Sequence, residues 1–221
     1  MKRTILLIIL CLALSCGKEK SIQLPEIDHS EIIEIHDVSA AYLFYDKTQK
    51  DSMELNQKNL ISTTNWLVNV DKRLTLKQVI PHIKFLQEKK ANSSHKNENA
   101  KNYFTCHDLS RNNLGFIEFT DVVYENEMTN YSIDIEKLTT FIRVENLKTI
   151  KIQSSDMEDI LTNSNKLDNS FKKYLVNRFD NRIIVLVFDK NIYFQDYITI
   201  KSRLKELNSE NITISKTEFI Y

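Results

Sequence analysis

The chain has 221 residues, and 30 Lys and Arg are balanced by 30 Asp and Glu, so its formal net charge is zero. This balance does not favour nucleic-acid binding, which depends on a basic face. The only two glycines are Gly17 and Gly115, which excludes phosphate-binding loops, dinucleotide fingerprints and nucleophile elbows, because all of these need several glycines.

The N-terminus has the pattern of a bacterial export signal. Lys2 and Arg3 precede an apolar stretch at residues 5–14. This stretch is too short to span a bilayer, because a membrane-spanning helix needs about 20 apolar residues. The residues Ala13-Leu14-Ser15-Cys16 resemble a lipobox. We therefore expect residues 1–15 to be a lipoprotein signal peptide and Cys16 to carry the lipid, which anchors the protein to the outer membrane on its periplasmic face or at the cell surface. An ordinary signal peptide and a buried helix are the alternatives.

The residues after Cys16 are polar, and we expect residues 16–30 to form a tether. The sequence Gly17-Lys18-Glu19-Lys20 resembles the tether of surface-exposed lipoproteins of Bacteroidota, although a solvated linker would have the same composition. The whole chain resembles uncharacterised flavobacterial lipoproteins. After signal cleavage the only other cysteine is Cys106, so we expect no internal disulfide.

The next segments predict strands and one helix. Apolar or β-branched residues favour strands at 32–36, 40–46 and 62–70, with a polar turn at 46–56. A helical stripe begins after Thr75, whose spacing to Gln78 fits a capping box. Pro81 either kinks this helix or is its first residue.

The second part of the chain alternates strands with helices. The run at 183–188 is apolar throughout, as expected for a central strand buried on both faces. We expect residues 130–147 to be strand and turn with a short helical piece. Further strands are expected at 103–106, 115–124, 149–153 and 212–221, and helices at 167–179 and 197–207. The predicted fold is α/β or α+β, with a mixed sheet and amphipathic helices.

Two segments, 66–86 and 184–204, align without gaps. Asp71-Lys72 and Asp189-Lys190 follow a strand in each, and a helix comes next. The sequence therefore predicts two similar βα(β) halves, at 31–130 and 131–221, although any two strand-turn-helix units would share this pattern.

Residues 184–214 resemble the periplasmic domain of the ExbD/TolR family. The matching features are the strand at 185–187, the Asp189-Lys190 turn, the aromatic Phe194, the helix to Leu204 and the strand at 212–214. The resemblance implies a small αβ sandwich used for protein contacts in the cell envelope.

Few residues suggest catalysis or metal binding. Cys106 and His107 are neighbours in a predicted strand and face opposite ways, so a Cys–His pair would need a distant partner such as His82. The histidines lack zinc-site spacing. Glu31 and Glu34 face opposite ways beside His36, and we expect the cluster of Lys84, Lys89, Lys90, Lys96 and Lys101 to be a solvated loop.

We therefore expect no enzyme activity, no cofactor and no metal. The leading hypothesis is a lipid-anchored protein-binding or structural module with an envelope protein as its partner. The alternatives are a surface hydrolase using carboxylates or Cys106, and a small-ligand binder with a deep apolar pocket between the two halves.

Overall fold

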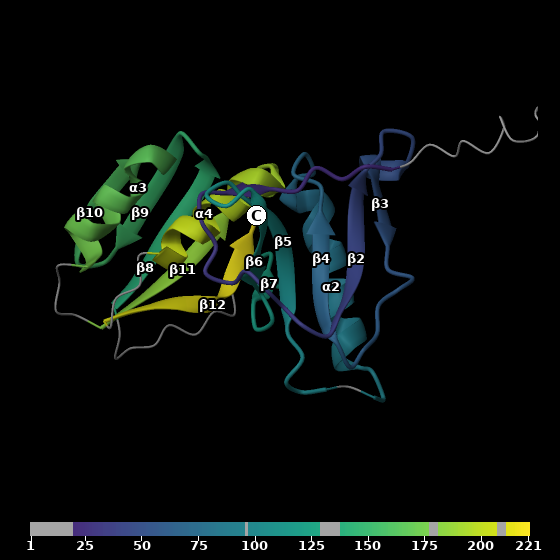
Figure 1. Cartoon of the computed structure of the whole chain (residues 1–221). Coiled ribbons are helices and arrows are strands. Elements are labelled where there is room, and N and C mark those ends of the chain that lie inside the picture. The colour runs from purple at the N-terminus through teal and green to yellow at the C-terminus, as the bar shows by residue number, and fades with distance from the viewer. Residues whose placement is uncertain (1–19, 96, 129–137, 177–180, 207–210) are drawn as a thin grey trace, which may run out of the picture.

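The computed structural model describes residues 20–95, 97–128, 138–176, 181–206 and 211–221. Two six-stranded mixed sheets lie side by side (Figure 1). The first sheet contains β1 (Glu26–Ile27), β2 (Val38–Tyr45), β3 (Met53–Asn56), β4 (Asn65–Val70), β5 (Asn102–Asp108) and β6 (Asn113–Glu118). The second contains β7 (Val123–Glu125), β8 (Leu138–Asn146), β9 (Thr149–Ser154), β10 (Met157–Thr162), β11 (Arg182–Phe188) and β12 (Ile212–Ile220).

The helices of the described residues are α2 (Leu76–Ala91), α3 (Ser164–Phe171) and α4 (Phe194–Glu206), with a 3₁₀ turn η1 (Lys50–Ser52) and a π-helical turn η2 (Lys172–Val176). No helix among the described residues is both long enough and apolar enough to cross a membrane.

The two sheets share one strand order. It is β1-β5-β4-β2-β3 in the first and β7-β12-β11-β8-β9 in the second, with β6 and β10 as additional strands. In each sheet the first four of these strands are parallel and the fifth is antiparallel. The predictions of a mixed α/β fold and of two similar halves are confirmed, and each half runs strand-Asp-Lys-helix-strand through its middle.

The Asp-Lys turns are structurally equivalent. The Asp71 amide donates to the carbonyl of Leu43 at 3.0 Å, and the Asp189 amide donates to Val144 at 3.0 Å. Each amide thereby extends the pairing of the two central parallel strands of its sheet. The ungapped alignment of the sequence therefore corresponds to a real equivalence in three dimensions.

The helix α2 begins where its capping box predicts. The Thr75 amide donates to the Gln78 side chain at 2.8 Å, and the helix continues through Pro81 to Ala91. The alternative in which Pro81 is the first helical residue is wrong. Pro81 lies on the exposed side of the helix, and Lys77, whose carbonyl loses its usual hydrogen-bond partner, is exposed as well.

The two halves cross at the segments that lead into α2 and α4. Thr75 and Tyr193 form an antiparallel bridge. Around it lie two pairs of backbone hydrogen bonds, and in each pair one amide of each half donates to a carbonyl of the other half. In the first pair Leu76 donates to Ile192 and Phe194 donates to Leu74; in the second Lys77 donates to Lys190 and Gln195 donates to Lys72. Because each bond maps onto its partner when the halves are exchanged, a pseudo-two-fold axis passes through the bridge.

One hydrophobic core extends through both halves. The ring of Phe104 on β5 stacks on Phe119 at 3.9 Å and meets Phe194 and Tyr197 of α4 edge-on at 5.1 and 6.3 Å. The second half therefore supplies two of the three rings that pack against Phe104 here. The halves are consequently joined by packing as well as by the backbone bridge.

The strand β11 lies between β8 and β12 and is buried on both faces, as its apolar run predicts. Ile184, Leu186 and Phe188 belong to the main core. Val185 and Val187 form a second cluster with Phe219 on the opposite face. Continuous hydrophobicity is thus explained by two separate buried surfaces.

Several expectations differ from the structure. Residues 32–36 form no strand apart from an isolated bridge between Ile32 and Phe116. The predicted polar turn at 46–56 ends in a strand, β3. The strand β7 pairs with β12, so the second sheet begins before the expected boundary at residue 131. Part of the 130–147 prediction lies outside the described residues.

The expected tether at 16–30 is also corrected. Residues 20–27, which we call the strap, cross the carboxyl edge of the first sheet and end as β1 (Figure 1). The Lys72 amide donates to the Gln23 carbonyl at 2.7 Å, and the His107 amide donates to Pro25 at 2.8 Å. Backbone pairing, which composition does not reveal, holds these polar residues in place.

Candidate binding groove

A groove of about 740 Å³ lies between α2 of the first half and the carboxyl end of the second sheet. The buried side chains of Leu76, Ile80 and Ile220 form its apolar interior. Phe85 and Tyr221 stand at its rim and are 46% and 43% exposed. Its remaining lining residues are polar or helix-surface residues: Lys77, Pro81, Lys84, Glu88, Asn126, Glu127 and Lys190.

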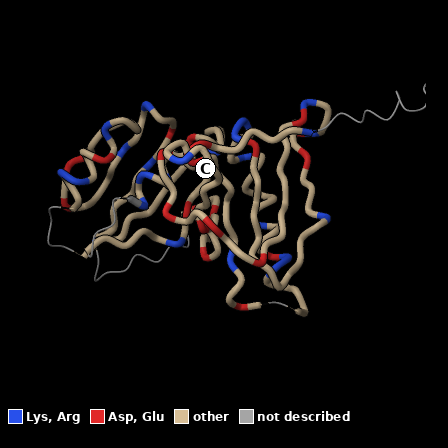
Figure 2. The backbone as a smooth tube through the Cα atoms, in the orientation of Figure 1, with Lys and Arg blue, Asp and Glu red and all other residues tan. Residues whose placement is uncertain are grey.

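The groove combines apolar and charged walls. Lys77, Lys84 and Lys190 line it, and within the described ranges none of the three forms an ion pair. Glu88 and Glu127 line the same groove. Unpaired charges around an apolar interior can orient a bound group that has an aromatic or aliphatic body and charged substituents. Figure 2 shows that positions with both charge signs are spread along the whole described backbone.

The equivalent space in the other half is closed. The Gln195 side chain of α4 accepts from the Glu26 amide at 2.8 Å and donates to the Glu26 carbonyl at 2.9 Å. This bidentate contact holds α4 against β1, and the cavity beside it has a volume of only about 60 Å³. Lys77 occupies the equivalent position on α2, so the groove results from a difference between two otherwise similar halves.

A buried polar cluster lies under α4. The Tyr197 hydroxyl donates to Glu218 at 2.8 Å and lies 3.2 Å from the Tyr124 hydroxyl, while Lys201 pairs with the other oxygen of Glu218. Burial raises the pKa of both tyrosines well above its usual value. The carboxylate is fully enclosed and its charge is matched by Lys201, so the cluster has the character of a structural ion pair.

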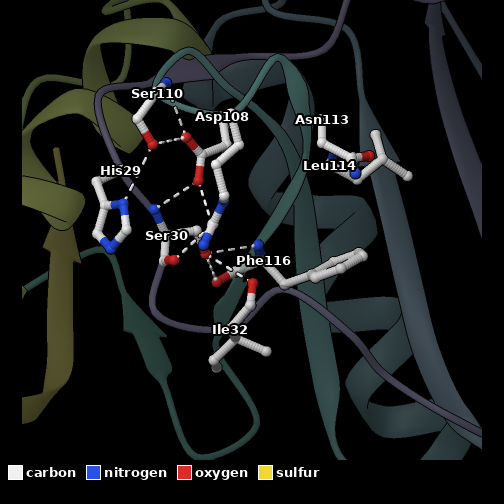
Figure 3. Close-up of polar contacts among 9 residues, drawn as sticks. His29, Ser30, Ile32, Asp108, Ser110, Asn113, Leu114 and Phe116 are labelled. Atoms are coloured by element: carbon white, nitrogen blue, oxygen red, sulfur yellow. Dashed lines mark hydrogen bonds and ion pairs between the residues drawn. The ribbon is translucent and has the colours of Figure 1, made fainter.

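A second polar cluster connects the β5–β6 turn to the chain after the strap (Figure 3). Asp108 accepts from the Ser30 amide at 2.9 Å and from the Ser110 hydroxyl at 2.6 Å, and it also pairs with Arg111. The ring of His29 lies 3.2 Å from the Ser110 hydroxyl.

This second cluster contains the residue types of a serine-hydrolase triad in a different arrangement. In a triad the histidine lies between serine and aspartate and removes the serine proton. Here Ser110 donates directly to Asp108, and hydrogen bonds from Ser110, Ser30 and Arg111 keep the pKa of Asp108 far below its usual value. His29 does not lie between Ser110 and Asp108, so the residues are not arranged as a triad, and their hydrogen bonds tie the turn to the chain.

Cys106 has the surroundings of a structural thiol. It is fully buried in the core, and burial raises the pKa of the thiol, whereas a nucleophilic cysteine needs a lowered one. His107 faces the other side and lies 3.1 Å from the Asn112 side chain. His82 lies on α2 beside η1 and β3, and burial lowers its pKa.

The remaining candidate residues do not converge. Glu31 pairs with Lys205, whereas Glu34 and His36 form an exposed pair at 3.6 Å. Within the part of the chain that the structure describes, no three His, Cys, Asp or Glu side chains form a group that could hold a metal ion.

The lysine cluster divides among different environments. Lys84 lines the groove, Lys89 bonds Gln57, Lys101 pairs with Glu118, and Lys96 lies outside the described residues. Lys90 is buried: it donates to the Asn102 side chain at 2.9 Å and lies over the Trp66 ring. Burial lowers its pKa to about 8. The expectation of a single solvated loop is therefore wrong for Lys90.

Sequence reasoning did not identify the groove residues. Phe85 stands outside the apolar stripe of α2, and this mismatch was the available signal that the residue could serve binding. Lys190 was noted only as part of a turn. Cys16 lies outside the described residues. Comparisons with protein-family models, with curated proteins and with solved structures found no match to this chain.

Proposed function

We propose that this protein is a lipid-anchored lipoprotein of the bacterial envelope that binds another envelope protein through the groove between α2 and the second sheet. The anchor is Cys16, and the module itself is not an enzyme. The observation that carries the proposal is the inter-half groove, with its apolar interior, its exposed rings and lysines that form no ion pair with any described residue.

The features of the groove support protein binding. Exposed aromatic residues beside apolar pockets are frequent anchors of protein interfaces. The ExbD/TolR-like segment implies envelope protein contacts, and it contributes Lys190 to the groove. The clusters around Cys106 and Asp108 serve packing and turn structure, which favours binding over hydrolysis.

The anchor is tested by metabolic lipid labelling of the wild type and Cys16→Ala, together with protease shaving of intact cells. We expect label that depends on Cys16. Loss of the protein on shaving identifies the cell surface, and protection identifies the periplasmic face. Absence of label from the wild type would contradict the anchor.

The groove is tested by cross-linking in intact cells followed by affinity purification. Phe85→Ser and Lys84→Glu should reduce recovery of a specific partner by about tenfold or more, as expected for interface anchors. Lys173→Glu on η2, away from the groove, is the matched control and should leave recovery unchanged. Equal recovery for all variants would rule the groove out.

A small ligand is the second candidate. The groove lies between the two halves, where a ligand binder was expected to have its pocket, and its volume falls within the range of small-molecule sites. Native mass spectrometry of the protein purified from its own envelope distinguishes the two. A bound small molecule that is absent from Phe85→Ser would favour the ligand.

A further inference from the structure

The strap fixes where the chain leaves the folded molecule. Lys20 pairs with Asp46 and Glu54 at the β2–β3 turn, on the outer edge of the first sheet. The Gln23 amide donates to Asp71 at 3.2 Å, and Lys72 pairs with Glu26 at 2.6 Å. From Lys20 onward the chain is therefore held against the fold.

Very little chain remains between this point and the proposed anchor. Four peptide steps separate Cys16 from Lys20, and even when fully extended they span only about 14 Å. A domain of this size has a diameter of about 40 Å. The attachment point must therefore stay close to the membrane surface, and the molecule cannot turn its opposite end toward the lipid.

Figure 1 shows the two ends of the molecule: β3 and the chain entry lie at one, and β10 with α3 at the other. We propose that the β2–β3 end of the first half rests on the membrane surface and that the β10–α3 end of the second half projects away from it. This inference depends on the proposed anchor at Cys16.

The surface at the β2–β3 end fits a lipid headgroup layer. Lys47 and Lys50 are exposed on the turn. Lys20 pairs with both Asp46 and Glu54 and offsets part of their negative charge, so exposed groups of both signs at this end can meet a polar headgroup layer. Hydrogen bonds from Thr48 and Lys20 hold the pKa of Asp46 at about 2, so it stays charged and keeps its pairing at neutral pH.

The orientation can be measured on vesicles. The mature chain, beginning at Cys16, is coupled through that thiol to a maleimide lipid in phosphatidylcholine–phosphatidylglycerol vesicles that also contain an amine-reactive headgroup lipid. Cys106 is fully buried and does not compete for coupling. Mass spectrometry then measures acylation of Lys47 and Lys50 relative to Lys172 and Lys173 on η2, each normalised to its reaction with a soluble amine reagent.

We expect acylation at Lys47 and Lys50 to exceed that at Lys172 and Lys173 by about fivefold or more, since the short tether excludes the far end from the surface. Insertion of twenty Gly and Ser residues between Gly17 and Lys18 should bring the ratio close to one. A ratio near one, or an excess at Lys172 and Lys173, with the natural tether would overturn the inference. Because the coupling is chemical, this result does not depend on whether cells lipidate Cys16.

Discussion

The glycine at 115 illustrates how one residue position connects sequence to packing. A Cβ atom at this position would lie 2.6 Å from the Ser30 Cβ, so β6 and the chain after the strap pack more closely than any other residue allows. The chain has almost no other glycine, and this one is needed for close approach.

We therefore expect Gly115→Ala to lower the free energy of unfolding by about 1–3 kcal/mol, the usual cost of overpacking. Urea unfolding followed by Trp66 fluorescence measures the change. Asn113→Ala, at an exposed position of the same strand, is the control and should have little effect. An unchanged stability for Gly115→Ala would show that the contact with Ser30 relaxes easily.

The buried Arg182 provides a pH-dependent prediction. Its guanidinium is inaccessible to solvent and bonds Asp156 at 2.7 Å, and the hydrogen bond from Arg182 holds the pKa of Asp156 far below its usual value. A carboxyl group whose pKa is lower in the folded state than in the unfolded state stabilises the fold. The stabilisation is complete when the pH is above the pKa of the unfolded state, and it is lost as the pH falls toward the pKa of the folded state.

Asp156→Asn should therefore lower the free energy of unfolding by about 2–3 kcal/mol at pH 7, because it weakens two charge-assisted hydrogen bonds from the buried guanidinium. The difference from the wild type should shrink progressively below about pH 4. Chemical denaturation at pH 7 and pH 3 measures both values. Asp159→Asn, whose exposed side chain pairs with Lys151, should show a much smaller effect.

At the scale of elements, the contact between α4 and β1 holds the strap. Gln195→Ala removes both hydrogen bonds to the Glu26 backbone, and we expect a loss of about 1–2 kcal/mol. Hydrogen exchange at the Glu26 amide should accelerate markedly. Gln87→Ala is the matched comparison, because it removes one hydrogen bond from α2 to the Val122 carbonyl, which is not part of the strap. It should leave the hydrogen exchange of the Glu26 amide slow.

The prediction of elements from the sequence succeeded where periodicity was strong. The stripe of α2, its capping box and the apolar run of β11 all describe local chemistry, and each was found as predicted. The strands β3 and β10 were not predicted, because Met53–Asn56 and Met157–Thr162 are half polar and lie at sheet edges with one solvated face. The strap could not be told from a tether, because its residues are polar and the backbone bonds and ion pairs that hold it are made with residues far away in the sequence.

The candidate groove could not be predicted, for a related reason. Its walls come from α2 and from the end of β12, which are far apart in the sequence and meet only through the crossing of the two halves. The aligned Asp-Lys turns predicted that two similar units exist. How those units pair depends on the bridge between Thr75 and Tyr193, which is a tertiary contact without a sequence signal.

For the whole molecule, the continuous core predicts cooperative unfolding. Trp66, the only tryptophan, reports on the first half, while Phe104 is covered by rings from the second. We expect fluorescence and far-ultraviolet circular dichroism to give coincident denaturation curves, both shifted by Phe104→Ala by about 3–5 kcal/mol. Two separate transitions would show that the halves fold independently.

The reciprocal bridge has a practical consequence. The turn at Thr120–Asp121 lies immediately before the strand that joins the second sheet, so a chain divided there separates the two sheets into different polypeptides. Each fragment would expose backbone amides and carbonyls that bond the other fragment, together with the apolar surface that the other fragment covers. The fragments would then reassemble with a concentration dependence that reports the strength of the crossing, so the divided protein would serve as a split reporter.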